Sequence, residues 1–230
     1  MSKKERRLSV KIIAHKIRAH FPDWVYTLCL KLRYFFFTER CSQTDDQTKD
    51  YSDGSWVERK TTSDLRLIQD YLSSLKNTSI LQVGTGNMSL YKSLYNGSDV
   101  FYGITIVEAE ADLGRKTLIE YSDTKSKVVF LDKYSADFSF LEEKRVSVIV
   151  DNDISSYACC KYHFDKMLRV YSELITENGI ILVGLKGLGY FDNGFGLTAE
   201  MLANLVKPYG LSVEQSDYCF ILKRNDAAMN

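Results

Sequence analysis

Two glycines stand where the chain leaves a short apolar run, and their spacing could serve a ligand. Gly84 and Gly86 directly follow the run at 80–83, and a helix is predicted after them. Glycines let the backbone turn sharply and approach a ligand closely, and the first turn of a helix offers unpaired N–H groups to a carboxylate or a phosphate. The stretch 82–87 therefore predicts a ligand-binding turn, with a ligand-free strand-to-helix turn as the alternative.

Carboxylate and amide side chains gather after a second apolar run, at 146–150. Asp151, Asn152 and Asp153 follow this run directly, and His163 lies further along the chain. Because ligands of parallel α/β sheets bind at the carboxyl ends of the strands, we expect the first three to face a site. An imidazole with a pKa of about 6.5 suits removal of a hydroxyl proton. His163 is thus the candidate general base, with Asp151 and Asp153 as further catalytic candidates. Solvated turn residues and a structural histidine are the alternatives.

The elements that must position these residues alternate along the chain. Buried strands are predicted at 79–83, 100–106, 128–131, 146–150 and 180–185, with helices beginning near 63 and spanning 89–94, 108–121, 162–176 and 198–206. This order is typical of a mainly parallel sheet covered by helices on both faces. The last apolar runs, 211–215 and 218–223, are so close together that they predict an antiparallel hairpin. The expected fold class is α/β, with seven strands.

Residues 1–60 differ in character from the rest of the chain. Apolar side chains recur at helical spacing in the first half of this segment, and ten of residues 1–40 are lysine or arginine. Residues 38–60 are polar and turn-rich, as linkers are. We expect a basic amphipathic extension and linker, followed by one domain at 61–230. Residues 1–40 suit peripheral contact with an anionic membrane or a partner protein, and packing on the chain's own domain is the alternative.

The composition excludes several classes of protein. In a chain of 230 residues, 45% are hydrophobic and 26% are charged, which excludes a wholly disordered or fibrous protein. Thirty basic residues balance thirty acidic ones, and no basic and aromatic motif surrounds the candidate site. Nucleic acid is therefore not expected as a partner.

The cysteines and the apolar runs indicate the compartment. Five cysteines include no CxxC pair and no spacing typical of zinc ligands, so we expect a reducing compartment and no zinc site. No apolar run reaches the ~20 residues that span a bilayer, and basic residues interrupt the start of the chain. We expect a cytoplasmic protein, with peripheral attachment to the inner membrane face as a further possibility.

The order of the predicted elements, over about residues 63–224, resembles the class I S-adenosylmethionine-dependent methyltransferases. In that family the first strand and turn read acidic-x-Gly-x-Gly-x-Gly, and Gly84 and Gly86 match two of these glycines. Gln82 stands at the acidic position, and Met88 stands at the last glycine. The resemblance implies a Rossmann-like sheet and S-adenosylmethionine as cofactor, with S-adenosylhomocysteine as product.

The resemblance also implies roles for individual residues. The family ends its second strand in an acidic residue that holds the ribose hydroxyls, and Thr105 has that place, with Glu108 as the alternate. An Asp that faces the adenine amino group follows the third strand, which Asp132 matches, with Asp137 as the alternate. The implied cofactor-binding residues are Gln82, Gly84, Thr85, Gly86, Asn87, Thr105, Asp132, Asp151 and Asn152.

Metal-dependent O-methyltransferases of this fold hold magnesium with carboxylates after the fourth and fifth strands. Asp151 or Asp153 can supply the first carboxylate, but residues 185–187 include none, so no metal is predicted. Methyl transfer to a hydroxyl of a small molecule or sugar, in glycan or natural-product modification, is the function expected.

Two other functions remain open. The departures at Gln82, Met88 and Thr105 fit a non-catalytic relative that keeps the fold as a scaffold. A nicotinamide-dependent Rossmann enzyme is the third hypothesis, although Ser89 replaces the last glycine that a GxGxxG motif requires.

Overall fold

The computed structural model describes residues 22–41, 57–58, 60–76, 78–95, 98–135, 137–141, 145–189 and 195–225. A seven-stranded sheet in the order β3-β2-β1-β4-β5-β7-β6 forms its centre. The strands are β1 (Thr78–Val83), β2 (Ser98–Thr105), β3 (Lys127–Phe130), β4 (Val146–Asp151), β5 (Ile175–Gly184), β6 (Leu211–Gln215) and β7 (Cys219–Arg224). The predicted α/β class is confirmed.

The first five strands run parallel, and only β7 runs against its neighbours. β7 lies between β5 and β6, so the predicted C-terminal hairpin is also confirmed. From β1 the chain adds β2 and then β3 on one side, and it then returns to add β4 on the other side of β1. Val83, the last residue of β1, lies between Ile104 of β2 and Asp151 of β4. Polar residues that follow these three strands must therefore meet at one edge.

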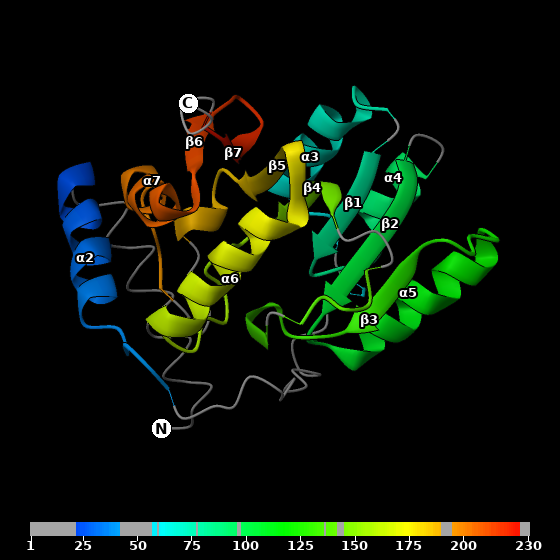
Figure 1. The fold of residues 1–230 in the computed structure, drawn as a ribbon, viewed down its shortest axis with the longest axis horizontal. Coiled ribbons are helices and arrows are strands. Elements are labelled where there is room, and N and C mark those ends of the chain that lie inside the picture. Colours follow the sequence, from blue (N-terminus) through cyan, green and yellow to red (C-terminus); the bar gives the residue numbers. More distant parts are fainter. Residues whose placement is uncertain are drawn as a thin grey trace.

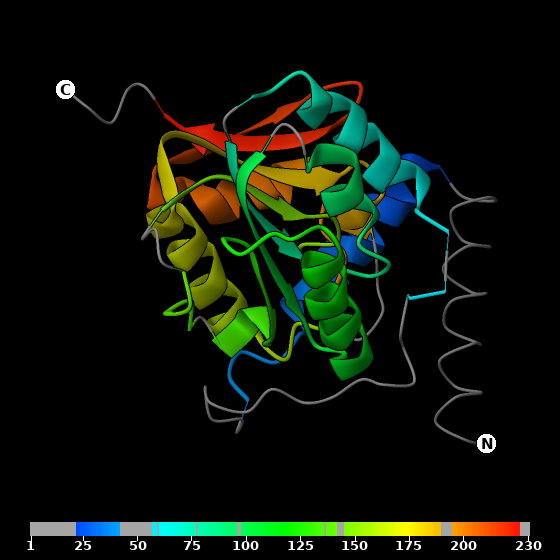
Figure 2. The same ribbon diagram turned by 90° about the vertical axis from the view of Figure 1, so that its right-hand side faces the viewer.

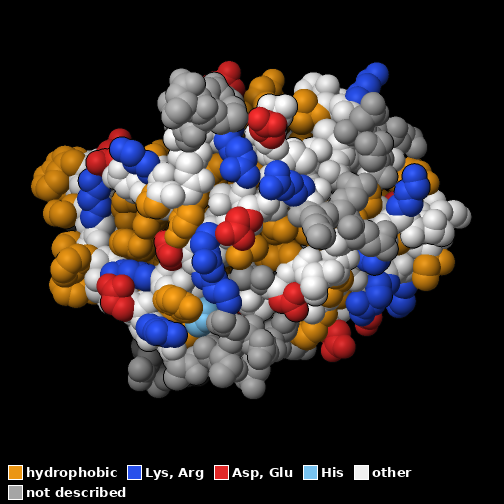
Figure 3. Space-filling view, viewed as in Figure 1, with side chains coloured by type: hydrophobic (Ala, Val, Ile, Leu, Met, Phe, Trp, Pro, Cys, Tyr) orange, Lys and Arg blue, Asp and Glu red, His pale blue; other side chains and the backbone are white. Residues whose placement is uncertain are grey.

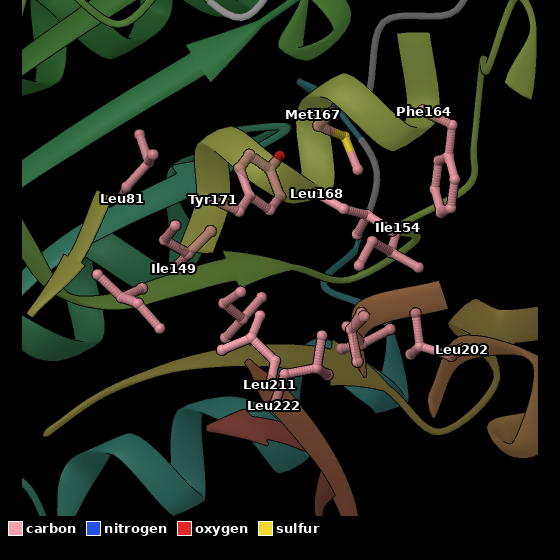
Figure 4. Close-up of a cluster of buried hydrophobic side chains, with 14 of the residues drawn as sticks. Leu81, Ile149, Ile154, Phe164, Met167, Leu168, Tyr171, Leu202, Leu211 and Leu222 are labelled. Atoms are coloured by element: carbon pink, nitrogen blue, oxygen red, sulfur yellow. The ribbon is translucent and has the colours of Figure 1, made fainter. Parts of the chain in front are cut away.

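Helices cover both faces of the sheet (Figures 1 and 2). On one face lie α3 (Ser63–Ser73), α4 (Ser89–Leu94) and α5 (Glu108–Glu120), and on the other lie α6 (Lys161–Leu174) and α7 (Ala199–Val206). Successive strand residues point to opposite faces. Ile80 therefore packs in the core beneath α3 to α5, whereas Leu81 packs in the core beneath α6 and α7. Figure 4 shows this second core, which α6 supplies with Phe164, Met167, Leu168 and Tyr171.

Most element boundaries lie within two residues of their predictions, and the largest difference is at the start of β5. The helix predicted at 162–176 ends at Leu174, and β5 begins at Ile175, five residues before the strand predicted at 180–185. Ile175 pairs with Val146 of β4, after which the register shifts. The first part of β5 carries exposed polar residues, so it has no apolar run that could have marked it as a strand.

The described part of the N-terminal segment forms α2 (Asp23–Phe35), which lies beside α7 (Figure 1). Leu30 is buried there, and Lys31 forms an ion pair with Glu200 of α7 at 3.0 Å. The outer row of the helix and the residue after it stay exposed, and hydrophobic side chains gather at this edge in Figure 3. This row consists of Trp24, Leu28, Leu32, Phe35 and Phe36.

Several expectations concern residues that the structure does not describe. Residues 1–21 and 42–56 lie outside the described ranges, and they include most of the amphipathic stripe and of the linker. The boundary between extension and domain at residue 60, and contact of residues 1–40 with a membrane or protein, therefore stay predictions. No helix within the described ranges has both the length and the hydropathy of a membrane span.

The contact between α5 and β3 leaves no room for a side chain at Gly114. A Cβ at this position would lie 2.6 Å from Cγ1 and 2.9 Å from Cβ of Val128. Valine has one strongly preferred rotamer in most settings, so it cannot turn aside cheaply. Gly114 thus sets how closely the helix approaches the sheet.

We predict that Gly114→Ala lowers the free energy of unfolding by about 1–3 kcal/mol through overpacking, although alanine favours helices. Urea unfolding of the two single variants and of Gly114→Ala/Val128→Ala gives a double-mutant cycle. Truncation of Val128 should recover part of the loss. A cycle in which the two changes simply add would contradict the proposed clash.

Candidate functional site

A cavity of about 190 Å³ opens at the carboxyl ends of β1, β2, β3 and β4. Residues Lys60, Thr61 and Thr62, before α3, and Leu65, in its first turn, form another wall. The predicted site residues that line it are Gln82, Gly84, Thr85, Gly86, Asn87, Thr105, Asp132, Asp151, Asn152 and Asp153. The structure therefore brings all the predicted cofactor residues together, while their roles stay predictions.

The turn after β1 adopts the backbone conformation that its glycines favour. Gly84 has φ 76°, Gly86 has φ 51°, and the N–H of Gly84 donates to the carbonyl of Ile104 at 2.8 Å. Met88, at the place of the family's last glycine, also has a positive φ of 59°. Its side chain is fully buried, and this burial opposes the cost of the left-handed conformation. The turn thus keeps the shape of a glycine-rich turn without the third glycine.

Several buried polar atoms on the cavity wall have no protein partner. Gln82 donates from Nε2 to the carbonyl of Gly84 at 2.9 Å, which leaves its Oε1 unpaired. Oγ1 of Thr85 and Oδ1 of Asn152 are also buried and unpaired. Buried polar atoms are almost always hydrogen-bonded, so Oε1 of Gln82 and Oγ1 of Thr85 are candidate contacts for a polar ligand, whereas Oδ1 of Asn152 packs against Gly184 at the end of β5.

Glu110 supplies a carboxylate that the sequence analysis missed. Its Oε2 accepts a hydrogen bond from Oγ1 of Thr105 at 2.7 Å and another from the N–H of Gly86 at 3.3 Å. It is buried on the cavity wall, whereas the alternate residue Glu108 is exposed. The acidic group absent from the end of β2 is thus replaced from the first turn of α5. Glu110 lies at helical spacing from Gly114 and Leu118, which share the buried face of α5. This spacing was the feature of the sequence that could have predicted its burial.

A buried ion pair joins the ends of β3 and β4. Nζ of Lys133 contacts both carboxylate oxygens of Asp151, at 3.0 and 2.8 Å, and both side chains are almost fully buried. The same ammonium donates to the carbonyls of Asp153 at 3.1 Å and Ile154 at 2.9 Å. The hydroxyl of Tyr171 in α6 donates to Asp151 at 3.1 Å. With these partners, Asp151 holds the cavity wall in place, and its carboxylate is already neutralised.

Asp153 presents a different carboxylate to the same cavity. Burial raises the pKa of Asp153 to about 6, with a further contribution from the negative charge of Asp151, while Lys133 acts in the opposite direction. Burial also raises the pKa of Asp132, whose Oδ1 accepts a hydrogen bond from the N–H of Tyr134 at 3.0 Å. A carboxylate with a pKa of about 6 is still ionised at pH 7 and is more basic than usual, as a general base requires.

His163 does not lie where the sequence analysis expected a base. It is buried in the first turn of α6 and does not line the cavity. Its Nδ1 instead contacts the sulfur atoms of Cys41, Cys159 and Cys160. Of the three catalytic candidates, Asp153 therefore has the best position for proton transfer within the cavity.

Solved structures of methyltransferases share this fold. The chain is similar to the CcbJ methyltransferase of Streptomyces caelestis, with a TM-score of 0.59 and 13% identity over 79% of this chain and 99% of that one. An S-adenosylmethionine-dependent methyltransferase of Clostridium acetobutylicum gives a TM-score of 0.53 and 9% identity, over 70% of this chain and 90% of that one.

An enzyme of another reaction class also shares the fold. The [4+2]-cyclase SpnF gives a TM-score of 0.50 and 14% identity, over 78% of this chain and 65% of that one. No protein-family model matches the sequence, and no curated protein matches it. The chain thus has the fold of the class I S-adenosylmethionine-dependent methyltransferases, and the reaction must be argued from the site.

We predict that Lys133→Met lowers the free energy of unfolding by about 3–5 kcal/mol, because it leaves the buried carboxylate of Asp151 without its cation. Lys223→Met is the matched control, since Lys223 pairs with Glu214 at 2.6 Å on the surface, where both side chains are about half exposed. Its loss should be below about 1 kcal/mol. Chemical denaturation at pH 7 measures both, and equal losses would contradict a dominant role for the buried pair.

Proposed function

We propose that this chain transfers a methyl group from S-adenosylmethionine to a hydroxyl group of a small molecule or sugar. One observation carries the proposal: a single cavity joins the glycine turn after β1 to the carboxylate of Asp153, whose pKa is raised to about 6. The turn suits a cofactor, and the carboxylate suits an acceptor that must lose a proton. The fold and the unpaired atoms on the cavity wall support the same assignment.

The residues that would hold the cofactor lie along one side of the cavity. S-adenosylmethionine supplies an electrophilic methyl group on a sulfonium centre. Gln82 offers its unpaired Oε1 to the amino-acid end, and Thr105 with Glu110 offers hydrogen-bonding groups to the ribose hydroxyls. Asp132 is the candidate partner of the adenine amino group, and it lies on the cavity wall after β3.

The protein's chemical work is alignment and removal of one proton. Methyl transfer gains from the correct placement of two reactants, and a hydroxyl acceptor must lose its proton as the new bond forms. Asp153 accepts this proton in the proposed reaction. Burial is the main cause of the raised pKa of Asp153, the nearby carboxylate of Asp151 adds to it, and Lys133 opposes it while holding both groups in position.

The structure weakens the main argument for a non-catalytic scaffold. That argument depends on Gln82, Met88 and Thr105, which depart from the family's pattern. Met88 nevertheless keeps the positive φ of a glycine, and Glu110 restores a carboxylate beside Thr105. Gln82 lines the cavity and retains a buried, unpaired acceptor oxygen. Each departure thus has a local replacement, which favours a working cofactor site.

Calorimetric titration with S-adenosylmethionine, S-adenosylhomocysteine and NAD tests the cofactor. We predict saturable binding of the two adenosyl ligands and none of NAD. Gln82→Leu should weaken adenosyl binding at least about tenfold, because it removes a hydrogen bond to the ligand and one to the turn. Gln215→Leu, at an exposed position of β6, is the matched control and should bind normally. A folded wild-type protein that binds neither adenosyl ligand would overturn the proposal.

The proton-transfer step has a defined pH dependence. The active form of Asp153 is the carboxylate, so kcat/KM for a hydroxyl acceptor should be constant above pH 7 and fall as the pH decreases through about 6. Asp153→Asn should lower turnover by roughly 10²–10⁴-fold and abolish this decline, while cofactor affinity stays within a few-fold.

Asp137→Asn is the matched control, because Asp137 is exposed and does not line the cavity. It should retain the wild-type pH profile. Full activity of Asp153→Asn, with the decline near pH 6 still present, would show that another group accepts the proton.

A further inference from the structure

Three cysteines and one histidine converge at the start of α6, outside the cavity. Nδ1 of His163 lies 3.4 Å from the sulfur of Cys41, 3.3 Å from that of Cys159 and 3.1 Å from that of Cys160. The sulfurs of Cys159 and Cys160 are 3.9 Å apart, and all four ligand atoms lie within 4.8 Å of one another. Cys41 is 122 residues before His163, so the fold, and not a local motif, assembles this cluster.

The spacing of the four atoms is close to that of a tetrahedral metal site. Zinc binds thiolate sulfur at about 2.3 Å and imidazole nitrogen at about 2.1 Å, so tetrahedral ligands stand about 3.8 Å apart for two sulfurs and about 3.6 Å for sulfur and nitrogen. The three sulfur–nitrogen distances are about 0.2–0.5 Å shorter than this, and the distance between the sulfurs of Cys159 and Cys160 is about 0.1 Å longer.

Local structure prepares three of the ligands. Cys160 is the N-cap of α6, and its sulfur accepts a hydrogen bond from the backbone N–H of His163 at 3.5 Å. Cys159 and Cys160 precede His163 by four and three residues, a spacing that brings side chains together at a helix start.

Cys41 lies on the segment that follows α2. The N–H of Lys161 donates to the carbonyl of Thr38 at 2.9 Å, and the N–H of Tyr162 donates to the carbonyl of Glu39 at 3.0 Å. The side chains of Lys161 and Glu39 also form an ion pair, at 2.5 Å. These contacts bind the segment to the first turn of α6 and bring Cys41 beside the other three ligands.

We propose that Cys41, Cys159, Cys160 and His163 bind one zinc ion in a closed structural site. The three thiols lose their protons to solvent when the metal binds, and the imidazole binds through Nδ1. Soft thiolates select zinc over magnesium and calcium, and four protein ligands leave no open position for catalysis. The proposal is independent of the proposed function, because none of the four residues lines the cofactor cavity.

Such a site would connect three parts of the protein. It would link the segment after α2 and the start of α6 to the loop after β4. That loop includes Ser156 and Tyr157, which line the cavity just before Cys159. Metal binding would thus fix the wall of the cavity and the place of the N-terminal segment together.

Elemental analysis of the full-length protein tests the proposal. The protein is expressed with zinc in the medium and purified under reducing conditions without chelator. We expect about one zinc per chain. Metal-free protein titrated with Co²⁺ should show the intense visible bands of tetrahedral cobalt and thiolate-to-cobalt charge transfer in the near ultraviolet. Cys41→Ser and Cys159→Ser should lose most of the bound zinc and change the cobalt spectrum.

Two cysteines outside the cluster provide matched controls. Cys29→Ser, at an exposed position, and Cys219→Ser, in β7, should retain the full zinc content and the cobalt spectrum. Wild-type protein that holds no zinc and gives no tetrahedral cobalt spectrum would overturn the proposal, even if a cluster variant fails to fold. A disulfide between cluster cysteines in freshly isolated, metal-free protein, or a different metal at these ligands, would also overturn it. Adenosyl binding, measured separately, keeps this result distinct from failure of the proposed function.

Discussion

The ammonium group of Lys133 is the point on which the edge of the sheet depends. It neutralises the carboxylate of Asp151 at the end of β4. Because both side chains are almost fully buried, water and solvent cations cannot take its place. By donating to the carbonyls of Asp153 and Ile154, it also shapes the turn after β4. A buried charge pair gives little net stability compared with an apolar pair, but loss of one partner is costly. The pair therefore contributes more to the local geometry than to the net free energy of unfolding. The shape of the cavity wall depends on this geometry.

Much of the fold was predictable because it follows from local patterns. Buried parallel strands read as short apolar runs, and helices between them read as amphipathic segments, so the α/β class and the terminal hairpin could be predicted. The start of β5 at Ile175 could not, because its pairing with Val146 depends on a neighbouring strand and not on its own residues. The close contact of Gly114 with Val128 was hidden for the same reason.

The site was predictable where residues directly follow strands, and much less so elsewhere. The glycine turn, Asp132 and the residues after β4 lie in one cavity, as expected from the convergence of strand ends. Lys133 reads as a loop residue, and nothing in its neighbours marks it as buried. His163 was expected beside the cavity, but its partners include Cys41, 122 residues away. No zinc site was predicted because the sequence has no local spacing of zinc ligands, and ligands brought together by the fold leave no such spacing.

Met88 has a consequence for how the molecule meets its ligand. Met88 has a positive φ and a fully buried side chain, so a change in the backbone of the turn would pull this side chain out of the core. Its packing therefore fixes the conformation of the turn. The glycine turn is thus anchored at its far end beneath α4, while Gly84 is fixed at the near end by its bond to Ile104. Its conformational entropy is lost when the chain folds and not when a ligand arrives. Recognition at this turn should therefore proceed as a rigid fit, with the backbone already in its bound shape.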